Sequence, residues 1–335
     1  MSTVEPTTPK TLLDAIVYFA NPDNCINYLA FYRWPKGVVV CPTCGAKNAS
    51  YVASRRYWQC KTRHPKAQFS VKVGTIFEDS PLGLDKWLPT MWLIANCKNG
   101  ISSYEVARDL GVTQKTAWFM LHRVRLAMQG EDGGMLSGEV EVDETFIGGK
   151  ARNMHASKRR AKITGTGGKD KEIVFGMVER GGKVRAKHVE TRGKKELQAE
   201  IRENVAAGSA IFSDELLSYT GLDADYQHAV INHAVEYVNG NVHTNIMENF
   251  WSLLKRGLHG TYVSVEPFHL FRYIDEEAFR YNNRTDMNDG DRFNAVLSQV
   301  AGKRLTYAEL TGKVGETTEP TVIEIKPVEQ PWEPF

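Results

Sequence analysis

Three acidic residues stand in settings that would let them hold a divalent metal ion. Asp143 lies in the strand-like run 139–147, Asp214 ends the short apolar run 210–213, and Glu248 stands early in an amphipathic helical run. Carboxylates brought together repel one another unless cations neutralise them, and Mg²⁺ prefers oxygen ligands. Two such ions about 3.5–4 Å apart can clamp the attacking and leaving oxygens of a phosphodiester. The alternative for Asp143 is a carboxylate on a solvent-facing side, or one paired with an arginine.

A second set of residues has the types and spacing of a zinc site. Cys41 and Cys44 form a C-x₂-C turn followed by Gly45, and Cys60 ends the strand-like run 57–60. A second C-x₂-C would place its last ligand at position 63, which is an arginine, so we expect His64 to be the fourth ligand. The prediction is a closed, structural Zn²⁺ site. The alternative is a metal-free knuckle with Cys60 as a buried thiol.

The carboxylates need a sheet and a helix to bring them together. After the strand with Asp143, the pattern predicts a hairpin from 173–178 and 184–189, a helix over 194–205 and the strand that ends at Asp214. A small helix over 215–221, a strand over 230–238 and the helix with Glu248 follow. This order predicts a mixed sheet, with Asp143 and Asp214 on strands and Glu248 on a helix packed against them.

A pair of helices precedes this region and has the pattern of a helix-turn-helix. Serines at 102 and 103 can cap a first helix, Gly111 makes the turn, and Thr113 caps a longer helix. We expect polar residues to occupy the outer faces of the second helix: Gln114, Lys115, Trp118, His122, Arg123 and Arg125. Gln114 and Lys115 would then meet base edges in the major groove, with Arg123 also contacting DNA. A helical hairpin inside a bundle would give the same pattern.

Basic residues are concentrated in two parts of the chain. Residues 1–130 hold 16 Lys and Arg against 8 Asp and Glu, a net charge of +8, while the whole chain has a net charge of only +2. The stretch 150–171 holds eight Lys and Arg against one acid, and we expect it to be a flexible loop that contacts DNA phosphate. The proposed DNA contacts there and on the later helix are Lys150, Arg152, Arg159, Arg160 and Arg256. A solvated basic surface without a defined contact is the alternative.

Four stretches read in order resemble a known family: VDETFIGGK, FSDE, HTNIMENFWSLLKRGLHGTY and RYIDEEAFRYNNR. They are similar to bacterial insertion-sequence transposases of the DDE type that carry an N-terminal zinc ribbon, the ISXO2-like type. The resemblance implies a ribonuclease-H-like catalytic domain and a triad of Asp143, Asp214 and Glu248 that holds Mg²⁺ or Mn²⁺. It also implies a basic catalytic residue at Lys255. Asn245 could share the role of Glu248, and His243 could orient the site or contact phosphate.

The sequence therefore predicts an α+β multidomain protein. The expected parts are N-terminal helices (1–36), a zinc ribbon (37–80), a helix-turn-helix region (81–130), a ribonuclease-H-like catalytic domain (138–300) and a disordered tail (311–335). No apolar run reaches about 18 residues, so no membrane span is expected. The first ten residues lack the apolar region of a signal peptide, so we expect a cytoplasmic, nucleoid-associated protein.

The function expected from these features is DNA transposition. The protein would bind the ends of its own mobile element as a homo-oligomer on double-stranded DNA, cut a strand and join the freed 3′-hydroxyl to target DNA. Two alternatives from other functional classes stay open: a ribonuclease-H-like nuclease that cuts without joining, and a catalytically inactive DNA-binding regulator. An interaction protein that uses the zinc ribbon to bind other proteins fits the basic N-terminal region less well.

Overall fold

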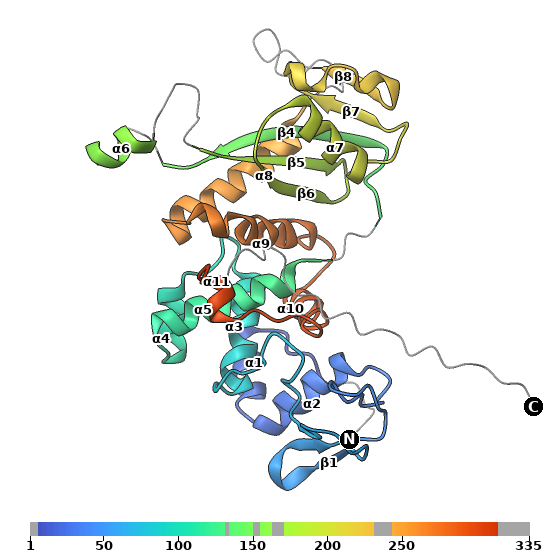
Figure 1. The fold of residues 1–335 in the computed structure, drawn as a ribbon, viewed down its shortest axis with the longest axis vertical. Coiled ribbons are helices and arrows are strands. Elements are labelled where there is room, and N and C mark those ends of the chain that lie inside the picture. The colour runs from blue at the N-terminus through green and yellow to red at the C-terminus, as the bar shows by residue number, and fades with distance from the viewer. Residues whose placement is uncertain (1–5, 131–133, 150–154, 163–170, 231–242, 314–335) are drawn as a thin grey trace, which may run out of the picture. The chain divides into compact units, whose positions relative to one another are not determined.

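The chain forms two compact units in the computed structural model, which describes residues 6–130, 134–149, 155–162, 171–230 and 243–313 (Figure 1). Unit 1 comprises residues 1–97, 101–128 and 287–335, and unit 2 comprises residues 98–100 and 129–286. The sequence placed residues 287–300 in the catalytic domain, whereas they belong to unit 1.

Helices build most of unit 1. α1 (Leu12–Phe19) begins with a capping box at Thr11, and α2 (Pro22–Arg33) begins after the Asn21 cap, so this part of the chain is helical, as the sequence predicted. Rings from α1, α2 and the later helices α3 (Leu84–Asn96) and α10 (Asp289–Leu297) form the core: Phe293 lies 5.4 Å from Trp92 and 5.7 Å from Phe19 between ring centroids. The short helix α11 (Tyr307–Leu310) follows.

Unit 1 also contains a small antiparallel sheet and the predicted helix pair. The sheet consists of β1 (Ser50–Val52), β2 (Tyr57–Gln59) and β3 (Gln68–Phe69) in that order, with the short 3₁₀ turn η1 (Ala53–Arg55) after β1. The helix pair is α4 (Ser103–Leu110), with a capping box at Ser102, and α5 (Gln114–Met128). Gly111 ends α4 with φ +62°, a left-handed conformation that glycine adopts without strain.

Unit 2 is built on a five-stranded mixed sheet in the order β6-β5-β4-β7-β8. β4 (Glu139–Ile147), β5 (Glu172–Glu179) and β6 (Val184–Val189) are antiparallel, which confirms the predicted hairpin. β7 (Ala210–Ser213) runs parallel to β4, and β8 (Gln227–Val230) runs parallel to β7. The sheet is therefore mixed, as the sequence predicted.

Helices cover both faces of this sheet (Figure 1). Alternate residues of β4 explain why: Val140 and Val142 pack in one core with Leu197 and Ile201 of α7 (Lys194–Asn204). A second core on the other face joins Ile147 of β4 and the β5 valines to α8 (Asn245–Arg256) and α9 (Leu270–Asn282). The middle of β4 is therefore covered on both faces, and among its acidic residues Glu141 is fully buried, whereas Glu139 at the start of the strand is exposed.

Three predicted elements of unit 2 differ from the structure. The predicted helix over 215–221 is two short 3₁₀ turns, η3 (Leu217–Tyr219) and η4 (Leu222–Ala224). The strand predicted over 230–238 starts earlier, as β8, and residues 231–242 lie outside the described part of the chain. The prediction that 150–171 is entirely loop is wrong for α6 (Ala156–Lys162), where Ala, Lys and Arg favour a helix.

α8 continues into a wider helical turn before α9. A π-helical segment, η5 (Gly257–Tyr262), follows α8 directly, and the 3₁₀ turn η6 (Pro267–His269) leads into α9. Among the residues that the structure describes, no helix combines the length and the apolar character needed to cross a bilayer.

Candidate active site and zinc site

Asp143 lies in the middle of β4 with its side chain turned toward α8. The Trp251 indole Nε1–H donates to Asp143 Oδ2 at 2.9 Å, which ties the carboxylate to the helix that carries Glu248. Burial raises the pKa of Asp143 to about 7, and the negative charges of Glu144 and Asp214 act in the same direction, whereas the Trp251 hydrogen bond lowers the pKa. The surroundings of Asp143 therefore disfavour its negative charge.

Asp214 follows the last residue of β7, next to Asp143. The parallel register pairs Glu139 with Ala210 and Glu141 with Phe212, so Asp143 and Asp214 each lie two residues beyond the last pair, and the charge of Asp214 raises the pKa of Asp143. Neighbouring strands lie about 4.8 Å apart, so two acids in register share one edge of the sheet. The Leu216 N–H donates to Asp214 Oδ1 at 3.0 Å and orients this side chain.

Glu248 lies exposed in the first turn of α8, one turn before Trp251. In the described part of the chain, one group of three or more potential ligands has all its ligand atoms within 4.8 Å, and it is the cysteine and histidine group described below. The carboxylates of Asp143, Asp214 and Glu248 therefore do not form a group with this separation. Lys255 is partly buried and Arg256 is exposed near the end of the same helix.

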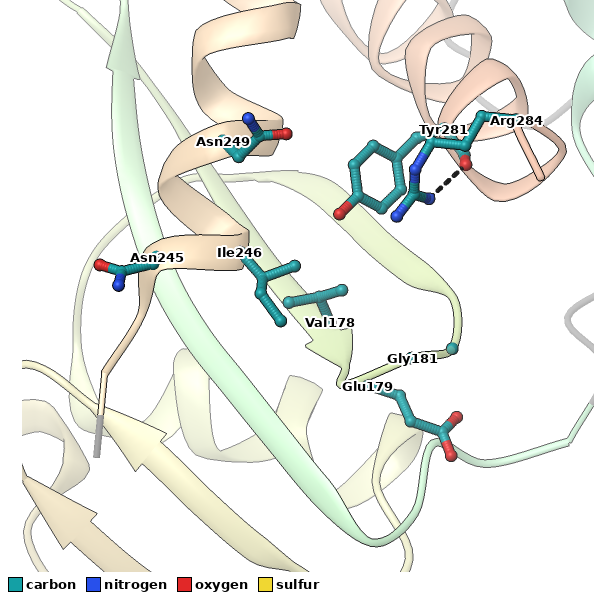
Figure 2. Close-up of a pocket in the computed structure, with 9 residues that line it drawn as sticks. Val178, Glu179, Gly181, Asn245, Ile246, Asn249, Tyr281 and Arg284 are labelled. Atoms are coloured by element: carbon teal, nitrogen blue, oxygen red, sulfur yellow. Dashed lines mark hydrogen bonds between the residues drawn. The ribbon is translucent and has the colours of Figure 1, made fainter. Parts of the chain in front are cut away.

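Asn245 lines a pocket of about 280 Å³ beside α8, with residues of the β5–β6 turn and the end of α9 (Figure 2). Across the pocket, the Arg284 guanidinium lies 3.6 Å from the Tyr281 ring and donates to the Tyr281 carbonyl oxygen at 2.6 Å. The residues that line this pocket include neither Asp143 nor Asp214. Asn245 therefore lies on the side of α8 that faces the end of α9. Trp251 lies on the side of α8 that faces Asp143.

Two glutamates of β4 were missed by sequence reasoning. Glu144 is buried on the α7 side, where the Tyr219 hydroxyl donates to its Oε2 at 2.6 Å and Arg192 lies 3.6 Å away. Glu141 is fully buried on the α8 side and contacts His243 Nδ1 at 3.0 Å. The sequence did contain a signal for them, because acids occur at 139, 141, 143 and 144 of one strand. Side chains at 143 and 144 point to opposite faces of the sheet, so these acids cannot all lie on a single solvent-facing side.

The four predicted zinc ligands come together in unit 1. Cys41 Sγ lies 3.5 Å from His64 Nε2, Cys44 Sγ lies 3.7 Å from Cys60 Sγ, and all four ligand atoms lie within 4.8 Å of one another. A tetrahedral ion with Zn–S bonds of about 2.3 Å separates its ligand atoms by roughly 3.5–3.8 Å, so the donor set fits zinc. His64 Nδ1 lies 2.6 Å from the Pro65 carbonyl oxygen, which leaves Nε2 for a metal when Nδ1 carries the proton.

The fold explains how distant residues reach this zinc site. Gly45 has φ +72° and closes the knuckle by donating its N–H to the Cys41 carbonyl oxygen at 2.9 Å. Cys60 directly follows β2, and its N–H donates to the Ala67 carbonyl oxygen at 2.8 Å, which folds the loop with His64 back toward the knuckle.

The helix pair α4–α5 presents fewer basic residues to solvent than predicted. Lys115 is exposed and Gln114 is partly exposed, with Gln114 Nε2 donating to Ser103 Oγ at 2.8 Å. The prediction that His122, Arg123 and Arg125 lie on outer faces is wrong, because all three side chains are buried. Arg123 donates to the carbonyl oxygens of Leu305 and Glu78 at 2.9 and 2.8 Å and thus ties segments of unit 1 together.

The basic stretch before β5 is only partly described. Arg159 and Arg160 are exposed on α6, while Lys150 and Arg152 lie outside the described residues. α6 therefore presents two neighbouring guanidinium groups to solvent.

Comparison with known proteins finds matches to two regions of the chain. A family model described as the ISXO2-like transposase domain matches residues 135–282, and one described as the transposase zinc-ribbon domain matches residues 20–62. The chain is 27% identical over 253 residues, covering 72% of this chain and 84% of the relative, to an uncharacterized protein in transposable element ISH50 of Halobacterium salinarum. The zinc-ribbon match and the Cys₃His group together support a structural zinc ion. Models of a transposase domain and of a transposase zinc ribbon thus both match the chain, which supports an insertion-sequence transposase.

Proposed function

We propose that this transposase cuts and joins DNA with a carboxylate triad of Asp143, Asp214 and Glu248 on a ribonuclease-H-like fold. The observation that supports the proposal is the parallel pairing of β4 with β7, which runs up to Glu141 and Phe212, two residues before Asp143 and Asp214. The hydrogen bond from Trp251 to Asp143 also joins α8 to this strand. The mixed sheet with helices on both faces supports the fold assignment.

The donor set suits Mg²⁺ or Mn²⁺. All three proposed ligands are carboxylates, which are hard oxygen ligands, and Asp143 has a raised pKa that a neighbouring cation would lower again. Bound between these residues, divalent ions would neutralise charge on the phosphodiester as a 3′-hydroxyl or water attacks it.

The chain's own residues would orient the reacting groups. The Trp251 N–H would hold the Asp143 carboxylate in a fixed orientation through its Oδ2. Lys255 lies two helical turns after Glu248 on a similar side of α8, where its ammonium group would contact substrate phosphate together with Arg256. Asn245 lies on the other flank, so we assign the third carboxylate position to Glu248.

DNA recognition is proposed for the parts outside the triad. α4 and α5 would act as a helix-turn-helix, with Gln114 and Lys115 near base edges, and the zinc ribbon would contact the element ends. Lys150, Arg152, Arg159 and Arg160 would bind phosphates near the triad. Joining two element ends requires two active sites, so we expect a homo-oligomer on DNA in the cytoplasm, at the nucleoid.

A strand-transfer assay tests this proposal. The purified protein, oligonucleotides with the two element ends and a target plasmid are incubated with Mg²⁺, and nicked and joined products are measured. Asp143→Asn, Asp214→Asn and Glu248→Gln should each abolish both products while DNA binding persists. Glu203→Gln, at an exposed position of α7, is the matched control and should leave the products unchanged. Cleavage without joining would identify a nuclease, and binding without cleavage a regulator; either result would refute the proposal.

A further inference from the structure

A buried ion pair in unit 2 lies outside the proposed triad. Arg180, just after β5, donates from Nε to Glu141 Oε1 at 2.9 Å; the Glu141 side chain is 0% exposed and that of Arg180 is 11% exposed. Removing two charges from water is costly and is rarely repaid by the pair alone. The further contacts of both side chains indicate what the pair does.

Glu141 caps α8 from another element. Its Oε2 accepts from the backbone N–H groups of Ile246 and Met247 at 2.9 and 3.2 Å. The first N–H groups of a helix have no partner within the helix, and Thr244, at the N-cap position of α8, makes no side-chain cap hydrogen bond. A strand carboxylate therefore fixes where α8 begins, and its negative charge favours the positive end of the helix dipole.

Arg180 connects this cap to β7 and to the segment before α8. Its guanidinium lies 4.2 Å from the ring of Phe212, and its Nη2 donates to the His243 carbonyl oxygen at 3.0 Å. It also contacts Glu139, which is 44% exposed, at 3.0 Å. One side chain thus contacts β4, β7 and the start of α8.

Each element that Glu141 and Arg180 contact also carries one residue of the proposed triad, two positions further along the chain. Glu141 lies two residues before Asp143, Phe212 lies two residues before Asp214, and Ile246 lies two residues before Glu248. A period of two keeps Glu141 and Asp143, and likewise Phe212 and Asp214, on the same face of the sheet. Any slip of β7 or α8 relative to β4 that separated the carboxylates would break the contacts of Glu141 and Arg180.

We propose that Glu141 and Arg180 are positioning residues that set the register of the three elements carrying Asp143, Asp214 and Glu248. The inference rests on the proposed function of that triad. Neither residue touches the reacting atoms in this role; the pair acts by holding the carboxylates where divalent ions bind.

The test measures Mn²⁺ binding to the full-length protein by electron paramagnetic resonance. Binding at the proposed site is the part of the wild-type binding that is lost in Asp143→Asn. Glu141→Gln keeps the size of the side chain but loses its charge, and it should weaken this binding by about 10- to 100-fold, as loss of an orienting partner does in metal sites. Hydrogen exchange at the amides of Ile246 and Met247 should accelerate in the same variant, while exchange in β5 and β6 stays unchanged. Arg180→Lys, which keeps the positive charge, should weaken Mn²⁺ binding to the same extent. It serves as the test variant if Glu141→Gln does not fold.

Glu139→Gln is the matched control because it removes the exposed partner of the same arginine, and it should leave Mn²⁺ binding unchanged. Wild-type Mn²⁺ affinity in folded Glu141→Gln and Arg180→Lys would overturn the positioning role and leave the proposed function intact. Failure of the wild-type protein itself to bind Mn²⁺ through Asp143 would instead refute the proposed triad.

Discussion

At the scale of single residues, some surroundings of Asp143 raise its pKa and others lower it. Burial and two neighbouring acids disfavour its charge, whereas one indole N–H favours it, and the net effect raises its pKa to about 7 from an ordinary 3.8. The folded protein therefore binds a proton at Asp143 more tightly than the unfolded chain does. The resulting stabilisation is full below pH about 4 and is lost as the pH rises through about 7.

This shift predicts a pH-dependent difference between the wild type and Asp143→Asn. The free energy of unfolding, measured by urea denaturation with a chelator of Mg²⁺, should fall for the wild type relative to the variant between pH 5 and pH 8, because asparagine stays neutral. A constant difference over this range would show that Asp143 does not titrate there. Adding Mg²⁺ at pH 8 should restore stability to the wild type and not to the variant.

At the scale of elements, α8 approaches the sheet closely because Gly176 has no side chain. Gly176 pairs with Asp143 across β4 and β5, and a Cβ added there would lie 2.4 Å from Met247 Cε and 2.6 Å from Trp251. The glycine thus admits the indole that holds Asp143.

Gly176→Ala should therefore displace Trp251 and lower the free energy of unfolding by about 1–3 kcal/mol, the usual cost of overpacking a core. Urea denaturation measures the loss, and Trp251 fluorescence, isolated by comparison with a Trp251→Phe variant, reports the displacement. Gly260→Ala is the control, because an added Cβ there meets nothing within 4 Å. Equal stability of the two variants would contradict the packing argument.

The exposed arginines of α6 make a second prediction at this scale. Arg159→Ala should lower the slope of log affinity against log salt concentration by about 1 if it contacts one DNA phosphate. Lys195→Ala, at an exposed position of α7, should leave the slope unchanged. Fluorescence anisotropy of labelled element ends over a salt series measures both, and identical slopes for Arg159→Ala and the wild type would exclude a phosphate contact.

Periodic patterns in the sequence predicted most of the helices and strands. The burial and partners of single side chains depend on contacts between these elements, which the patterns do not show. Local signals predicted the β5–β6 hairpin and the Cys₃His group, because a turn and a ligand spacing are each encoded within a few residues. Arg123 was misplaced because a helical pattern cannot show that Leu305 and Glu78, far along the chain, accept its hydrogen bonds. Glu141 was missed for the same reason: its partners lie 39 and 105 residues away.

At the scale of the whole molecule, the small sheet β1–β3 buries only Trp58 and Phe69 among its own strand residues, so we expect it to need a bound metal for stability. Chelation of zinc, or Cys41→Ser, should unfold this sheet, because metal binding replaces a core too small to fold alone. Hydrogen exchange should then increase at β1–β3 and stay unchanged at β4 and β5, and affinity for element ends should fall. Cys97→Ser, outside the zinc group, is the control; unchanged exchange at β1–β3 after metal removal would show that zinc is dispensable there.

The course of the chain through the two units has a consequence for synthesis. Unit 2 is complete once residue 286 has left the ribosome, but Phe293 of α10, which fills the ring cluster of unit 1, is translated later. Until then the nascent helices α1–α3 leave Trp92 and Phe19 without that partner. The unit that is translated first is thus the last to be completed, because a helix near the other end of the reading frame covers part of its apolar surface.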